Sequence, residues 1–193
     1  MIKNKDRSKW FGASDTHIIM GSWNTKTFIK WWCVKLGLLK NGFKTKETMA
    51  GDAYEHKIAK AVEEDLSIKL KLDRQIKIKK LRIRVNLDAD CKKLNKIFEI
   101  KTFKEIDDWK PPINYYEQVQ VQMYFTKMKA SIVAYPMTKE YYKNYFLPIE
   151  KEKLQFYDFE LDNEFIQRYL ARLKVLVKCL KKKILPKQEM IEV

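Results

Sequence analysis

Hydrophobic residues recur with two different periods along this chain, and the change of period separates a helical part from a strand-rich part. Apolar positions three to four residues apart predict helices over 14–21, 25–42 and 46–65. Ser14 is the expected N-cap of the first helix, and Asn41-Gly42 the expected end of the second. Between 67 and 85, Ile, Leu and Val alternate with Lys and Arg, which predicts antiparallel strands with one buried and one basic face.

A second helical stretch follows a loop that ends in two prolines, Pro111 and Pro112. Proline is tolerated in the first turn of a helix, so we interpret 114–127 as a helix. The alternation of Gln and Val over 118–122 would also suit a strand. On a helix, Gln118 and Gln122 would share one face.

The remaining elements complete an α/β (α+β) arrangement. Segments 131–135 and 141–149 predict strands, and an amphipathic helix is expected from about residue 150 or from Asp162 to about residue 183. We therefore expect a single domain over 1–193, with N-terminal helices 14–65, a sheet and helix 67–149, and a C-terminal helix at about 150–183.

Charged residues gather at a predicted hairpin in the middle of the chain. Asp88 ends one strand, and after a short turn the next strand carries Glu99 and Lys101. Side chains alternate along a strand, so Glu99 and Lys101 point to one face while Phe98 and Ile100 point to the other. Two carboxylates side by side suit Mg²⁺ or Mn²⁺, and an ammonium group beside them can hold a water or balance charge on a phosphate. An ordinary hairpin with a solvated polar face is the alternative.

Several residues in the predicted helices 14–21 and 46–65 are further candidates for this site or for ligand binding. Gly51, inside the helix 46–65, costs about 1 kcal/mol relative to Ala, which suggests that another backbone or a ligand comes close. Glu55 lies one turn further on the same face, where it either reaches the hairpin carboxylates or is solvated. His56 beside it is a weaker candidate. Ser14, if it begins a helix, could bind a phosphate as well as cap the helix.

The composition narrows the class of partner. The chain carries 40 basic and 25 acidic residues, a net charge of +15, which favours polyanions such as nucleic acid. The three cysteines are scattered, and neither a zinc site nor a disulfide framework is expected. No stretch resembles a signal peptide or a membrane span. We therefore expect a protein of the cytoplasm, or of the host cytoplasm if a phage or prophage encodes it.

The ordered set of motifs resembles one family. The motifs are Arg7 and Ser14 in Arg-Ser-Lys-Trp-Phe-Gly-Ala-Ser-Asp, Gly51 to Glu55, Asp88, Glu99-Ile100-Lys101, and Gln118-Val119-Gln120. Together they resemble the YqaJ-type viral recombinases, which belong with phage lambda exonuclease in the PD-(D/E)XK nuclease superfamily. The resemblance covers roughly residues 7 to 135. It implies a restriction-endonuclease-like core, a central mixed sheet flanked by helices, that hydrolyses DNA with Mg²⁺, for which Mn²⁺ can substitute.

The resemblance also implies roles for residues. Asp88, Glu99, the Ile100 carbonyl and Glu55 would hold the metal, and Lys101 would position the attacking water. Gln118 would brace this set. Arg7, Ser14 and Lys104, the basic residue nearest to an arginine that the family has and this chain lacks, would contact DNA and its 5′-phosphate.

Several departures from the family pattern leave alternatives open. Leu87-Asp88-Ala89 stands where the family usually has Pro-Asp-Gly, so Asp90 is a competing ligand. The string 120–124 also matches the glutamine motif of RecB-like nucleases, so Gln120 competes with Gln118. Three scattered cysteines argue against a Cas4-like protein with an iron–sulfur cluster.

The resemblance implies a reaction and partners as well. Such enzymes degrade one strand of a duplex from its 5′ end and leave 3′ overhangs for a single-strand annealing protein, in homologous recombination. Lambda exonuclease suggests a homo-oligomer, a trimeric ring around the duplex. The alternatives are another PD-(D/E)XK nuclease, RecB-like, Cas4-like or an endonuclease, and a basic DNA-binding protein without activity.

Overall fold

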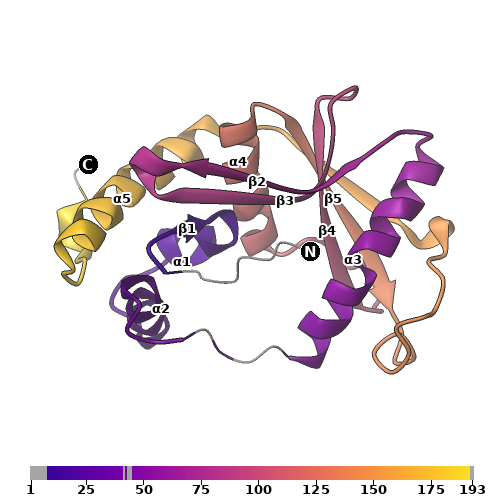
Figure 1. The fold of residues 1–193 in the computed structure, drawn as a ribbon, viewed down its shortest axis with the longest axis horizontal. Helices are drawn as coiled ribbons and strands as arrows, with labels where there is room; N and C mark the ends of the chain where they lie inside the picture. The colour runs from indigo at the N-terminus through magenta and orange to yellow at the C-terminus, as the bar shows by residue number, and fades with distance from the viewer. Residues whose placement is uncertain (1–7, 41, 43–44, 192–193) are drawn as a thin grey trace.

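A computed structural model describes residues 8–40, 42 and 45–191, and its centre is a six-stranded sheet (Figure 1). The strands are β1 (Phe11–Gly12), β2 (Lys71–Ile78), β3 (Ile83–Cys91), β4 (Lys96–Lys104), β5 (Lys129–Met137) and β6 (Gln155–Phe159). Their order is β1-β3-β4-β5-β6, and β2 pairs with β3. The β2–β3, β3–β4 and β5–β6 pairs are antiparallel, whereas β1–β3 and β4–β5 are parallel. The predicted mixed sheet is confirmed.

Helices cover the two faces of β4 and β5 in different ways. The helices are α1 (Thr16–Met20), α2 (Lys26–Leu36), α3 (Lys46–Asp65), α4 (Ile113–Thr126) and α5 (Asn163–Lys182). Phe98 and Ile100 pack against α3 in one core, while Ile97 faces a second core formed with α1, α2, α4 and α5. Figure 1 shows α3 on one side of these strands and α4 on the other. The residue alternation along β4 therefore decides which layer each side chain enters.

The predicted helices 46–65 and 114–127 are confirmed, but the first two helices differ in their ends. Ser14 does not cap a helix: it lies exposed in a short 3₁₀ turn, and Asp15 is the N-cap of α1. The second helix ends at Leu36, not at residue 42, because Gly37 takes a left-handed backbone with φ of 78°. Glycine adopts this conformation without steric cost, so it stops the helix early. Asn41 lies outside the described residues.

The C-terminal third holds the clearest errors of the sequence interpretation. Segment 141–149 is not a strand; it forms turns, and the Tyr141 ring packs edge-on against Tyr54 of α3 with centroids 5.1 Å apart. The missing strand is β6, which would lie inside the final helix if that helix started at about residue 150. The other expected start, Asp162, is confirmed. Asp162 is the true N-cap of α5, where its carboxylate accepts a hydrogen bond from the Phe165 amide at 2.9 Å. No helix in the described part of the chain is long and apolar enough to cross a membrane.

Gly51 lies where α3 comes close to β4. A Cβ placed on Gly51 would lie 3.2 Å from Thr102 Oγ1, which is tighter than ordinary van der Waals contact. We expected another backbone or a ligand near this glycine, but the group that comes close is a side chain, that of Thr102 in β4. The absent side chain lets α3 lie close to the strand that carries Glu99 and Lys101.

We expect the effect of Gly51→Ala to depend on Thr102. In the wild type, the helix propensity gained with Ala is offset by the contact, and the free energy of unfolding should change by less than about 0.5 kcal/mol. In a Thr102→Ala background the same change should stabilise by about 0.5–1 kcal/mol. Urea unfolding of the four proteins measures the coupling, and equal effects in both backgrounds would contradict the close approach.

Candidate active site

Strands β3 and β4 separate where the predicted hairpin carries its carboxylates. Their ladder ends at the pair Ala89 and Phe98. One position further, the Asp88 side chain takes over: its Oδ2 accepts a hydrogen bond from the backbone N–H of Ile100 at 2.8 Å. The carboxylate therefore fills a break in the sheet, and it is fixed beside Glu99 by a backbone bond.

Glu99 is the most connected group of the site. It is 3% exposed and accepts hydrogen bonds from three side chains. Lys101 Nζ lies 2.6 Å from its Oε1, and the Gln118 amide donates to the same oxygen. Gln122 Nε2 donates to Oε2 at 2.5 Å. A buried carboxylate needs such partners, and they hold it in one orientation.

The glutamines of α4 divide between two faces. Gln118 and Gln122, four residues apart, both contact Glu99. Gln120 points away: its Nε2 donates to the Glu160 carbonyl at 2.8 Å, and its Oε1 accepts from the Asp162 N–H at 2.7 Å. Gln120 thus fixes the entry to α5, and the glutamine at the site is Gln118, with Gln122 as a second one.

Glu55 of α3 borders the same site and belongs to a second group of ligand-type atoms. Glu55, His56 and Asp73 each place one such atom within 4.8 Å of the others. His56 Nε2 and Asp73 Oδ2 are 3.0 Å apart. The site is therefore flanked by an imidazole and a further carboxylate, the latter from β2.

The acidic groups of the site change one another's pKa values. Burial, and next the charge of Glu99, raises the pKa of Asp88 well above its ordinary value. Burial, followed by the charges of Asp73 and Glu99, raises the pKa of Glu55. Burial alone would lower the pKa of Lys101, but the carboxylates of Glu99 and Asp88 outweigh it and raise the pKa above its ordinary value. The positive charge of Lys101 therefore does not balance the negative charges of Asp88, Glu99 and Glu55.

This donor set fits a divalent cation. Asp88, Glu99 and Glu55 supply carboxylate oxygens, and Ile100 can add its carbonyl, which are the ligands that Mg²⁺ and Mn²⁺ prefer. A bound cation would lower the raised pKa of Asp88 and of Glu55 by favouring their charged forms.

A cavity of about 160 Å³ opens beside Asp88. It is lined by the turn that holds Ser14, by Lys35 of α2, by Arg84, Asn86 and Asp88 of β3, and by Gln118. We call it the Ser14 cavity. Its lining is polar, with two basic residues, Lys35 and Arg84, and two acidic ones, Asp15 and Asp88. Since Lys35 pairs with Asp15, Arg84 is the basic group that suits a phosphate next to the carboxylates.

A buried ion pair fixes the turn that forms one wall of this cavity. Asp15 accepts hydrogen bonds from the Gly12 N–H at 2.7 Å, from Trp31 Nε1 at 3.0 Å and from Lys35 Nζ at 2.6 Å. The side chains of Asp15 and Lys35 are 8% and 2% exposed. Ser14 is therefore presented on a turn that is anchored to α2.

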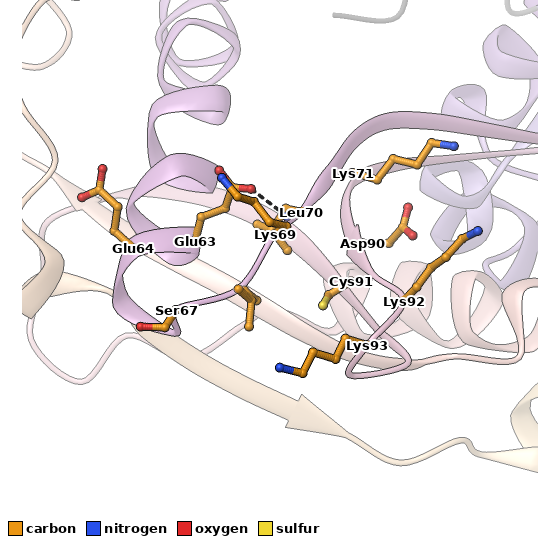
Figure 2. A pocket seen from close by; sticks show the side chains of 11 residues that line it. Glu63, Glu64, Ser67, Lys69, Leu70, Lys71, Asp90, Cys91, Lys92 and Lys93 are labelled. Atoms are coloured by element: carbon orange, nitrogen blue, oxygen red, sulfur yellow. Dashed lines mark hydrogen bonds between the residues drawn. The ribbon is translucent and has the colours of Figure 1, made fainter.

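Two other candidates, Asp90 and Lys104, lie elsewhere. Asp90 is buried and pairs with Arg74, Oδ1 to Nε at 2.7 Å, and it lines a cavity of about 780 Å³ at the end of α3 (Figure 2). Lys104 lines a third cavity, with Met137, on the opposite face of β4 from Lys101. Arg7 lies outside the described residues. The structure thus gathers Glu55, Asp88, Glu99, Lys101, Gln118 and Ser14, but neither Asp90 nor Lys104.

The sequence interpretation missed residues that come from distant parts of the chain. Gln122 was recognised only as sharing a face with Gln118, and neither Asp73 nor Arg84 was singled out within the alternating segment 67–85. A signal existed for Arg84 alone, because Arg84, Asn86 and Asp88 follow one another with the strand period of two.

Two carboxylates at the point where β3 and β4 separate, with a lysine two residues beyond the glutamate, form the residue pattern of a PD-(D/E)XK nuclease. The family model of the YqaJ-like viral recombinase domain matches residues 4–129, more than half of the chain. The chain belongs to this family. A comparison with curated protein sequences finds no match.

Solved structures share the fold at low sequence identity. The alkaline exonuclease LHK-Exo from Laribacter hongkongensis is 16% identical with a TM-score of 0.69, covering 92% of this chain and 90% of its own. Its complex with dAMP gives a TM-score of 0.67, again at 16% identity, with 91% and 89% covered. A phage-related exonuclease from Haemophilus somnus 129PT gives 0.62 at 16% identity, with 90% and 94% covered. The predicted fold class and family are confirmed.

Proposed function

We propose that this chain is a Mg²⁺-dependent exonuclease that digests one strand of duplex DNA from its 5′ end and leaves a 3′ single-stranded overhang. The observation that carries the proposal is the cluster of Asp88, Glu99 and Lys101 at the break between β3 and β4, with the Ser14 cavity directly beside it. A carboxylate pair can hold the metal while the cavity takes the phosphate at the strand end.

In this proposal, Asp88, Glu99, Glu55 and the Ile100 carbonyl hold the metal. When bound there, Mg²⁺ neutralises charge on the phosphate and helps to orient the water. Lys101, fixed by Glu99, holds the attacking water by hydrogen bonding and adds positive charge. The water oxygen bonds to phosphorus, the bond from phosphorus to the 3′ oxygen breaks, and that oxygen takes a proton. Gln118 keeps Glu99 in position.

The test is digestion of linear duplexes labelled at either the 5′ or the 3′ end, with Mg²⁺ or with EDTA. Progressive, Mg²⁺-dependent release of the 5′ label is expected, with the 3′ label retained on a long strand. Release of the 3′ label would show a nuclease of the opposite polarity, and cleavage of circular DNA would show an endonuclease. Either result would overturn the proposed 5′-to-3′ exonuclease while leaving a nuclease. Binding without any cleavage would instead favour a DNA-binding protein.

The two faces of α4 lead to a separable prediction. Gln118→Ala should lower the cleavage rate by about 10-fold or more with little change in stability, because it removes a partner of Glu99. Gln120→Ala should lower the free energy of unfolding by about 1–3 kcal/mol with a nearly unchanged rate, because it leaves buried backbone groups unpaired. Initial rates and urea unfolding measure both. A rate loss confined to Gln120→Ala would reverse the assignment.

The resemblance to lambda exonuclease supports further parts of the proposal. A single-strand annealing protein would receive the 3′ overhang, a ring of copies would keep the enzyme on its duplex, and the reaction would take place in the cytoplasm. Mass determination in solution tests the ring directly.

A further inference from the structure

Another cavity, of about 320 Å³, lies where the N-terminal segment, the start of β3 and the end of α5 meet. Five of its seven lining residues are basic, namely Lys9, Lys35, Arg82, Lys181 and Lys183, and the other two are leucines. We call it the basic cavity. In this cavity the lysine-rich end of α5 lies next to Lys9, near the other end of the chain.

Most of the positive charge of this cavity is not neutralised within the described part of the chain. Lys35 pairs with Asp15, but no carboxylate of the described residues forms an ion pair with Lys9, Arg82, Lys181 or Lys183. Trp10 lies beside them, with the Arg82 guanidinium 6.0 Å and Lys77 Nζ 5.7 Å from its ring centroid. Like charges repel at such short range, so this arrangement is unfavourable until an anion binds.

The backbone gives a second, independent observation. Three of the basic residues have left-handed backbones: φ is 61° at Lys9, 52° at Arg82 and 56° at Lys183. A residue other than glycine pays roughly 1–2 kcal/mol for this conformation. Glycine or asparagine would fit each position more easily, yet the chain has a long basic side chain at all three.

The basic cavity and the Ser14 cavity share a lining residue. Lys35 lines both, and Arg82 and Arg84 stand two residues apart at the start of β3. From Arg82 to Asp88 the chain advances six residues, or about 20 Å at roughly 3.3 Å per residue. One DNA strand advances about 3.4 Å per nucleotide, so this length corresponds to about six nucleotides.

We propose that the basic cavity binds backbone phosphates of the DNA about six nucleotides from the scissile phosphate. The inference rests on the proposed function, because it takes DNA as the ligand of the carboxylate site. Lysine and arginine side chains contact phosphates without reading bases, so the contact is independent of sequence. The cavity thus holds the nucleic acid in register while the carboxylates act on its end.

The test compares two triple variants that remove equal charge. Lys9→Asn, Arg82→Asn and Lys183→Asn together remove three of the five basic side chains that line the basic cavity, and asparagine tolerates the left-handed backbone. The control, Lys69→Ala, Lys92→Ala and Lys93→Ala, removes three exposed lysines around the cavity of Figure 2. Binding of a labelled duplex longer than two helical turns is measured in EDTA over a range of salt concentrations.

The first variant should lower the slope of log affinity against log salt by about 2–3 units, and it should bind roughly a hundredfold more weakly near 0.1 M salt. The control should change the slope by less than half as much. Equal effects of the two variants, or no effect of the first, would overturn the proposed role of the basic cavity in DNA binding. If the first variant does not fold, Lys181→Ala with Lys183→Asn, at two exposed positions, should still lower the slope by about 1–2 units.

Digestion by the wild type with Mg²⁺ is measured in parallel, so that two failures can be told apart. Absence of digestion overturns the proposed function whatever the binding results. Digestion together with equal binding by both triple variants overturns only the role of the basic cavity.

Discussion

Asp88→Asn should abolish cleavage and at the same time raise the stability of the metal-free protein. The amide oxygen of Asn can still accept the Ile100 N–H, so the break between β3 and β4 keeps its shape. The lost charge removes a ligand of the metal, and the cleavage rate should fall on the order of 10³-fold. Rates with Mg²⁺ and thermal unfolding in EDTA measure the two effects.

The gain in stability follows from the sign of the pKa shift. Burial and the charge of Glu99 raise the pKa of Asp88 in the folded protein, so its ionised form is disfavoured there relative to the unfolded chain. Stability is thus lost as pH rises from the ordinary pKa towards the raised one, and Asn removes this loss. Mg²⁺ should stabilise the wild type by binding to the folded state, and it should stabilise the variant much less.

Asp90→Asn is the matched control for this prediction. Asp90 lies two residues further along β3, where it pairs with Arg74. Its variant should keep cleavage within a few-fold and lose stability, because the Arg74 partner is removed. The opposite pattern, with cleavage lost only at Asp90, would contradict the assignment of Asp88 as the ligand.

Asp15→Ala should destabilise the fold by about 3–5 kcal/mol. The variant leaves the buried Lys35 ammonium without its partner and removes the acceptor of the Gly12 and Trp31 N–H groups. The free energy of unfolding from urea titration is the measurement. The turn that carries Ser14 also loses its anchor, so digestion should weaken even at temperatures where the variant stays folded.

A second substitution distinguishes the ion pair from general packing at this place. Lys35→Met in the Asp15→Ala background removes the buried positive charge while keeping much of the side-chain volume, and it should recover about 1–3 kcal/mol. If the double variant is no more stable than Asp15→Ala, the buried ammonium is not the source of the loss.

The parts of the fold that the sequence predicted well are those determined by local pattern. The helix 46–65 has a clear period and a threonine N-cap, and it matches α3 to the residue. The alternation over 67–85 correctly indicated antiparallel strands. By contrast, β6 is a short edge strand whose residues alternate between half-buried and exposed, and this weak signal merged with the pattern of α5.

The candidate site was predictable in the same uneven way. Glu99 and Lys101 share a face because of strand geometry alone, and Gln118 and Gln122 because of helix geometry. The contacts of Asp15 with Lys35 and of His56 with Asp73 depend on tertiary packing, which brings distant segments together. No spacing in the sequence announces such pairs, so the second acidic group and the anchored turn could not be foreseen.

Helix α5 and the segment after it form hydrogen bonds with the first two helices and the loop between them, although the family match ends at residue 129. The carbonyl of Ile184 accepts the indole N–H of Trp32 at 3.1 Å, and Gln188 Oε1 accepts the Trp23 N–H at 3.1 Å. Arg172 of α5 donates to the carbonyls of Ile19 and Gly21. The matched part of the sequence is therefore smaller than the folding unit: the N-terminal helices are held in place by hydrogen bonds to residues beyond the family match, so a chain cut at residue 129 would lose them.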